Sequence, residues 1–179
     1  MSLLVRPWLR MLFIKPPLVP LLALAWFIDG FWTIGNIRVL LESVAVDGFI
    51  VAGMTIVMIA AGFDLSVGAV MALGGVASVV LLPYGLLVSF AGAIGLGALA
   101  GVTSGTFVTR LHINPFIATL AVMVVLRGAL LAYTGTRPVV GLDERFLALG
   151  GGDPIPYAFL LMVLVLTLLH LSLSSRPWG

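Results

Sequence analysis

Long apolar runs separated by short polar stretches set the pattern of this chain. Within each run the hydrophobic side chains occupy every face instead of alternate positions. This is typical of helices surrounded by lipid and not of membrane-spanning strands. We expect six such helices, bounded by polar residues, prolines and glycines, over residues 18–31, 44–61, 65–82, 86–108, 115–134 and 157–173.

Composition supports lipid as the solvent of these helices. The 179 residues are 61% hydrophobic and only 9% charged, whereas a soluble domain carries about 25% charged residues. The predicted fold class is therefore all-α, a polytopic membrane helix bundle. The chain has no cysteine, which excludes disulfides and thiolate metal sites. Its net charge of +2 is too small and too scattered for nucleic-acid binding.

The distribution of basic residues predicts the topology. Basic residues favour the cytoplasmic side of a membrane, so we place the N-terminus in the cytoplasm. Residues 1–17 then form a cytoplasmic tail, 18–173 the transmembrane domain and 174–179 a truncated cytoplasmic segment, while the loop 135–156 faces outward. The inner segments hold Arg6, Arg10, Lys15, Arg110 and Arg176, and the outer ones Arg38, Arg137 and Arg145.

Signatures of enzymes are missing from the sequence. The single lysine, Lys15, lies in the N-terminal tail, and no phosphate-binding loop is present, so the chain cannot hydrolyse ATP by that route. His112 and His170 are isolated, and no Ser/His/Asp arrangement is evident. We therefore expect no enzyme activity, no metal and no cofactor.

Asp64 separates two long apolar runs. A carboxylate at such a position costs free energy if it lies in the hydrocarbon region of the bilayer. One interpretation makes it the N-cap of the helix over 65–82, with its carboxylate accepting the N–H of Ser66 or Val67. The other places it beside a pore or at a coupling surface. The two are compatible, since a broken helix is tolerated in a membrane where it lines a cavity.

Arg127 and Asp47 are two further charges inside apolar sequence. Arg127 lies thirteen residues after Asn114, about 20 Å along a helix, and Asp47 lies seventeen residues before Asp64, about 25 Å. If Asn114 and Asp64 both mark the inner membrane face, Asp47 and Arg127 lie at similar depth in the outer third of the membrane. We hypothesise that they pair, because an unpaired buried charge is costly. The alternative is that Arg127 extends to the outer interface.

Small residues recur along the fourth predicted helix. Gly97, Gly101 and Gly105 are four residues apart and therefore share one helix face. In lipid, such a face lets another backbone approach closely, which predicts a helix-packing seam. A direct role in transport is the alternative.

Three segments carry a resemblance to a known family. They are GMTIVMIAAGFDLSVGAVMALGGV (53–76), FVTRLHINPFIATLAVMVVLRG (107–128) and LLAYTGTRPV (130–139). With them the chain resembles the integral-membrane permease subunit of bacterial sugar ABC importers, of the ribose/xylose/galactose type. Phe63 replaces the isoleucine usual in the Gly-Ile-Asp-Leu-Ser-Val-Gly core, and Glu42 and Asp47 stand where relatives commonly have amides. Relatives are nearly twice as long, so the resemblance covers an N-terminal half.

The resemblance implies a multi-pass permease of the bacterial plasma membrane that works by alternating access. It would form the pathway for a monosaccharide delivered by an extracytoplasmic sugar-binding protein and be driven by a separate ABC ATPase subunit. A second permease copy, or the missing C-terminal half, would complete it in the lipid bilayer. By analogy the candidate pathway residues are Asp64, Ser66, Asn114, Phe116 and Thr119.

Two other functions remain open at this point. A permease of a branched-chain amino-acid importer would have to recognise a zwitterion, to which Asp47 or Arg127 could contribute. A truncated, non-transporting fragment could instead pack against a complete permease through the glycine face of residues 97–105.

Overall fold

A computed structural model describes residues 23–60, 62–141, 143–151 and 155–174. In that part of the chain, five helices are long and apolar enough to cross a membrane, which confirms the predicted polytopic helical bundle. The N-terminal tail, residues 175–179 and residues 18–22 of the first predicted helix lie outside the described residues. Of the rest of that helix, residues 23–26 are helical and 27–31 form turns and a bend, so the described chain shows no spanning helix there. The spans are α3 (Ile34–Ile59), α4 (Val67–Leu81) with the 3-10 turn η1 (Leu82–Tyr84), α5 (Leu86–Thr109), α6 (Pro115–Thr134) and α8 (Tyr157–Ser174).

Helix α3 starts ten residues earlier than the apolar pattern predicted. The polar stretch before residue 44, expected as a connection, is helical, and its Arg38 Nε contacts Glu42 Oε1 at 3.1 Å across one turn. At 26 residues the helix is about 39 Å long, more than the ~30 Å of hydrocarbon in a bilayer. Its first turns therefore extend beyond the lipid, where charged side chains carry no penalty.

The long loop after α6 also contains a helix that was not predicted, α7 (Glu144–Leu149). Asp143 caps it by accepting the N–H groups of Arg145 at 2.8 Å and Phe146 at 3.4 Å. The ring of Phe146 stacks on that of Phe90 in α5, with 6.1 Å between the centroids. Part of this loop is thereby attached near the start of α5.

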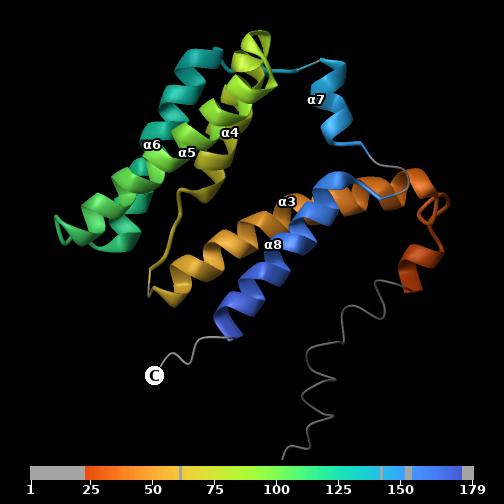
Figure 1. Cartoon of the computed structure of the whole chain (residues 1–179), viewed down its shortest axis with the longest axis horizontal. Helices are drawn as coiled ribbons and strands as arrows, with labels where there is room; N and C mark the ends of the chain where they lie inside the picture. The colour runs from red at the N-terminus through yellow and green to blue at the C-terminus, as the bar shows by residue number, and fades with distance from the viewer. Residues whose placement is uncertain (1–22, 61, 142, 152–154, 175–179) are drawn as a thin grey trace, which may run out of the picture.

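The spanning helices form two groups (Figure 1). Helices α4, α5 and α6 pack against one another, and α3 packs along α8, although these two helices are far apart in the sequence. The short α7 lies on the connection that leads from the first group back to α8 (Figure 1).

Helices α4 and α5 are antiparallel and closely packed. They are joined at Gly85, whose φ of +109° is a conformation that side chains other than glycine rarely adopt. The fully buried Ser89 donates its hydroxyl to the carbonyl of Ser78 at 2.5 Å. A methyl group at Gly92 would meet the end of the Leu81 side chain, which would have to shift, so the two helices lie close together here.

The α3–α8 seam is made of small residues and one methionine. Ala45 and Ala52 are the buried residues of α3, and Met162 is that of α8. A Cβ added at Gly48 would lie 2.6 Å from Cγ of Met162, so the two helices approach closely there.

Helix α6 matches its prediction. It begins at Pro115, with the Asn114 side chain accepting the N–H of Phe116 at 2.9 Å, and it ends at Gly135 in the left-handed conformation. Asparagine as cap and proline in the first turn together make this start predictable from sequence.

Candidate functional site

A break between α3 and α4 is the main irregular feature inside the bundle. Helix α4 has 15 residues against 24 in α5. A Cβ at Gly97 would touch Val70 at 3.6 Å, so these two residues mark the same level. From there α5 continues twelve residues to Thr109, about 18 Å, whereas α4 begins only three residues away, at Val67. Non-helical chain therefore runs beside α5 within the depth of the bundle.

Asp64 stabilises this break through Ser66. Its Oδ1 accepts the backbone N–H of Ser66 at 2.7 Å and the Ser66 hydroxyl at 2.6 Å. The prediction that Asp64 accepts the N–H of Ser66 is confirmed. The cap position itself belongs to Ser66, which is buried, so Asp64 stands two residues before it.

Thr119 connects the break to α6. Its Oγ1 accepts the N–H of Leu65 at 3.2 Å and lies 2.8 Å from the carbonyl oxygen of Pro115 and 3.3 Å from that of Phe63. A hydroxyl has one proton, so it donates to one of these carbonyls at a time. The buried hydroxyl thus holds the chain before α4 against the first turn of α6.

A cavity of about 390 Å³ opens beside the break. The residues around it come from the end of α3, the break, the last turns of α5 and the start of α6. They are Ile56, Val57, Ala60, Gly62, Phe63, Asp64, Gly101, Ser104, Gly105, Val108, Thr109, Pro115 and Thr119.

The glycine face of α5 is packed over only part of its length in the described chain. Only Gly97 meets a neighbouring helix, at the distance of an ordinary contact with Val70. A Cβ added at Gly101 or Gly105 would meet nothing within 4 Å, and both residues line the cavity. Over these two turns the small residues leave open space beside Asp64 and form no packing seam in the described chain. Gly48 and Gly92, which do mark close helix contacts, lack a repeating pattern that would have identified them.

The other predicted pathway residues lie outside the cavity wall. Asn114 is occupied as the cap of α6, and the exposed ring of Phe116 lies in the first turn of that helix. Ser66 is buried behind Asp64. The structure therefore brings Asp64 and Thr119 together at the cavity, and it adds Ser104, which the sequence had not singled out.

The hypothesised pair of Asp47 and Arg127 is not formed within this chain. In the parts that the structure describes, the one ion pair is that of Arg38 with Glu42. Asp47 on α3 and Arg127 on α6 both have exposed side chains. They belong to different helix groups.

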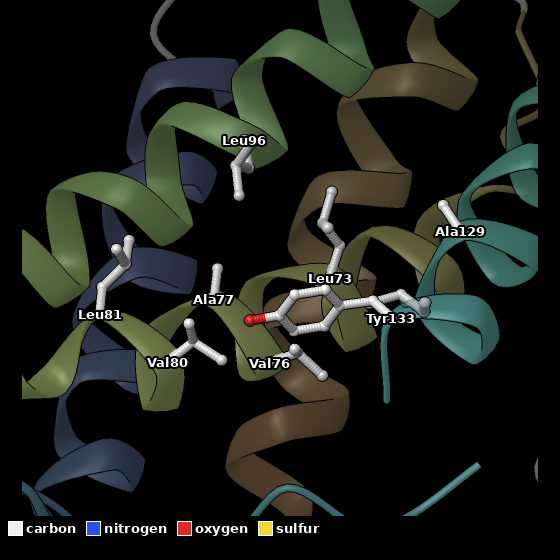
Figure 2. Close-up of a pocket in the computed structure, with 9 residues that line it drawn as sticks. Leu73, Val76, Ala77, Val80, Leu81, Leu96, Ala129 and Tyr133 are labelled. Atoms are coloured by element: carbon white, nitrogen blue, oxygen red, sulfur yellow. The ribbon is translucent and has the colours of Figure 1, made fainter. Parts of the chain in front are cut away.

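Two further cavities, of about 300 and 370 Å³, lie among α4, α5 and α6. Figure 2 shows the first, where Tyr133 reaches from α6 toward Val76 and Ala77 of α4. Its walls are hydrocarbon apart from the Tyr133 hydroxyl, so it offers at most one group to orient a polar ligand. Among the described residues, no cluster of three His, Cys, Asp or Glu side chains could hold a metal ion.

Comparison with known families decides the relationship of the chain. The family described as "Branched-chain amino acid transport system / permease component" matches residues 37–179. The chain belongs to this permease family. Together with its apolar helices, membership makes it a multi-pass protein of the bacterial inner membrane.

Curated relatives in this permease family confirm the resemblance to sugar-importer permeases. The ribose import permease protein RbsC of Bacillus subtilis is 39% identical over 156 residues, covering 80% of this chain and 47% of the relative. RbsC of Escherichia coli K12 is 40% identical over 119 residues, covering 65% and 37%. The L-arabinose permease protein AraH of Azospirillum brasilense is 34% identical, covering 76% and 41%.

The chain spans about half or less of the length of these relatives. The matched share of each relative is 47% for the Bacillus protein and 37% for the Escherichia protein. No solved structure is significantly similar to the chain.

Proposed function

We propose that this chain forms part of the translocation pathway of an ABC importer for a monosaccharide. Support comes from its place in the permease family and from relatives named for the import of ribose, arabinose and fructose. The structural observation that carries the proposal is the break before α4, which brings a carboxylate to a cavity inside an otherwise apolar bundle.

The chemistry of the cavity suits a polyhydroxylated substrate. Asp64 provides a carboxylate whose Oδ2 makes no hydrogen bond in the described structure. Hydroxyls of Ser104, Thr109 and Thr119 are close by, and Phe63 contributes an aromatic ring. Sugar hydroxyls can donate to the carboxylate while the ring covers an apolar sugar face. A Cβ at Gly101 or Gly105 would meet nothing within 4 Å, so these two residues leave space for a substrate beside the hydroxyls.

The chain requires partners for this function. It contains no ATP-binding loop, so a separate ABC ATPase would drive the conformational change. An extracytoplasmic sugar-binding protein would deliver the substrate. A second permease copy, or the C-terminal half that relatives possess, would complete the pathway.

A branched-chain amino acid is the second candidate substrate, because the family description names that class. A zwitterion needs a cation for its carboxylate as well as an anion for its ammonium group. Asp64 would be the anion, but no Lys or Arg lines the cavity among the described residues. The geometry therefore favours a sugar. A non-transporting fragment is the third candidate and predicts no uptake at all.

The test is uptake of labelled ribose and leucine by vesicles that contain the full chain, the remaining permease segment, the ATPase and the binding protein. Gly105→Leu should fill the cavity and reduce sugar uptake at least roughly tenfold with little loss of folding, because the space is open. Gly95→Leu is the matched control on α5, since it also points into open space but lines no described cavity.

Uptake of ribose that depends on ATP and is lost only in the Gly105 variant supports the proposal. Uptake of leucine alone would favour the amino-acid importer. If the chain neither co-purifies with the ATPase nor supports uptake of either compound, the proposal is wrong. The hypothesis of a non-transporting fragment is then favoured.

A further inference from the structure

Two opposite charges lie unpaired on the surfaces of separate spanning helices. Asp47 on α3 and Arg127 on α6 are exposed, and neither is within salt-bridge distance of an opposite charge in the described chain. A charge in the hydrocarbon region is costly, and such residues commonly pair with another charge or face a protein interior. Each of these two therefore calls for a partner that the described part of the chain does not supply.

The depth of Asp47 follows from its neighbour Gly48. Gly48 approaches Met162, which lies five residues after Tyr157 at the start of α8, about 8 Å along that helix. With 18 residues, α8 is about 27 Å long and just crosses the hydrocarbon. Asp47 thus lies about 8 Å below the membrane boundary at which α8 begins.

The depth of Arg127 follows from the end of α6. Arg127 lies seven residues before Thr134, about 10 Å along the helix, and α6 with its 20 residues also just crosses the hydrocarbon. The connection through α7 contains no spanning helix, so the end of α6 and the start of α8 lie at the same membrane face. The two charges therefore sit at nearly the same depth.

Both charges face away from the helices that their own group buries. At 3.6 residues per turn, Arg127 is about 180° from Ala118, about 140° from Val122 and about 80° from Thr119, the three buried residues of α6. Asp47 is about 160° from Ala45 and about 140° from Ala52, the buried residues of α3. Each side chain thus points outward from its helix group.

Extension of Arg127 to the nearest interface is disfavoured by helix geometry. Side chains on a helix slope toward its N-terminus. The nearest membrane surface lies toward the C-terminus of α6, at Thr134. The guanidinium group is therefore directed deeper into the bilayer, where a carboxylate partner stabilises it.

We propose that Arg127 of one copy pairs with Asp47 of a second copy. The chain carries both members of the pair at matched depth, so its surface is self-complementary in charge. A two-fold axis along the membrane normal would form the pair twice, once on each side of the interface. The inference rests on the proposed function only in requiring two copies, and its tests measure association, not transport.

Disulfide trapping is the first test, and the absence of native cysteine removes background. Full-length chains carrying Asp47→Cys and one tag are co-expressed with chains carrying Arg127→Cys and another tag, then oxidised in membranes. We expect a crosslink between the two tags. Val125→Cys, at nearly the same depth on another exposed face of α6, is the control and should crosslink at least about tenfold less.

Charge reversal distinguishes pairing between copies from pairing within one chain. Asp47→Arg alone and Arg127→Asp alone should each lower the fraction of dimer in nanodiscs about tenfold, because like charges then meet. Co-expressing the two variants places opposite charges together again at both contacts between copies. We expect association between the two tags to recover to near the wild-type level.

Three outcomes would overturn the proposal. One is a crosslink that forms only when both cysteines are in the same chain, which would establish the pair within one copy. Another is a crosslink no stronger than that of the Val125 control. The third is failure of co-expressed charge variants to recover association, which would leave Arg127 to another segment of the permease or to a lipid headgroup.

Discussion

The α4–α6 group and the α3–α8 pair bury different chemistry. All buried polar side chains of the described chain lie in or beside the first group, and they are Ser66, Ser78, Ser89, Ser104 and Thr119. The second pair buries Ala45, Ala52 and Met162. In lipid, helices associate through close packing and through hydrogen bonds, since the hydrophobic effect no longer separates helix from solvent. Hydrogen bonds are the main contact within the α4–α6 group, and close apolar packing is the main contact between α3 and α8.

This difference bears on which part of the molecule can move. Hydrogen bonds such as those of Thr119 and Ser89 have a fixed geometry, so α4, α5 and α6 hold one arrangement. The α3–α8 seam of the described chain buries apolar residues, whose side chains make no such hydrogen bonds. The cavity beside Asp64 has walls from both regions, since Ile56 and Val57 belong to α3. A displacement of α3 would therefore change its width.

Among the substitutions that test this difference, Asp64→Ala should lower the stability of the protein most. It removes the acceptor of two hydrogen bonds from Ser66, and we expect the α4 end of the first group to lose about 3 kcal/mol of stability. The midpoint of SDS-induced unfolding in mixed micelles measures the loss. Asp64→Asn keeps the accepting oxygen and should cost far less. Equal losses in the two variants would show that these hydrogen bonds do not hold the break.

Thr119→Val should have the second largest effect, a loss of about 2 kcal/mol of stability, because the N–H of Leu65 would lose its acceptor. Thr119→Ser retains the hydroxyl and is the matched control. Hydrogen exchange at Leu65, followed by mass spectrometry, should become faster in the valine variant alone. Unchanged protection would mean that Thr119 does not tie the break to α6.

Gly48→Ala examines the apolar seam and should cost about 1 kcal/mol, since the added methyl group meets Met162, which can adjust its rotamer. Gly53→Ala on the same helix meets nothing within 4 Å and controls for helix propensity. The unfolding midpoint should fall for the first variant only. If Gly48→Ala lost as much stability as Thr119→Val, the Met162 side chain would not be adjusting to the added methyl group.

Arg38→Gln should have the smallest effect, about 0.4 kcal/mol, because the pair with Glu42 is half exposed and lies on the part of α3 beyond the lipid. The same change at Arg137, for which the structure shows no ion pair, is the control. The difference between the two variants should vanish in high salt. If the difference between the two variants persisted in high salt, the pair of Arg38 and Glu42 would be shielded from solvent.

Sequence reasoning predicted most of the fold but placed the site only in part. Apolar length identified the five spans that the structure describes but also predicted one over 18–31 that the described residues do not show. Asn114-Pro115 located the start of α6 because capping is a local property. The start of α3 was misplaced, since polar residues in a helix that extends beyond the membrane look like a loop. Asp64 was recognised because a carboxylate between apolar runs is costly wherever it lies. The hydrogen bonds of its neighbours Leu65 and Phe63 with Thr119, which is 54 and 56 residues away, have no local signal.

The sequence alone determined that the chain crosses a membrane as helices, where most of those helices begin and end, and that it is related to sugar-importer permeases. These properties depend on hydrophobicity, capping and motif, which are read residue by residue. Only the tertiary structure decided that α8 packs on α3, that Gly101 and Gly105 face open space, and that Asp47 and Arg127 are apart in one chain. Apolar helices offer similar faces to many partners, so the pairing of faces follows from packing between distant segments and from no single stretch of sequence.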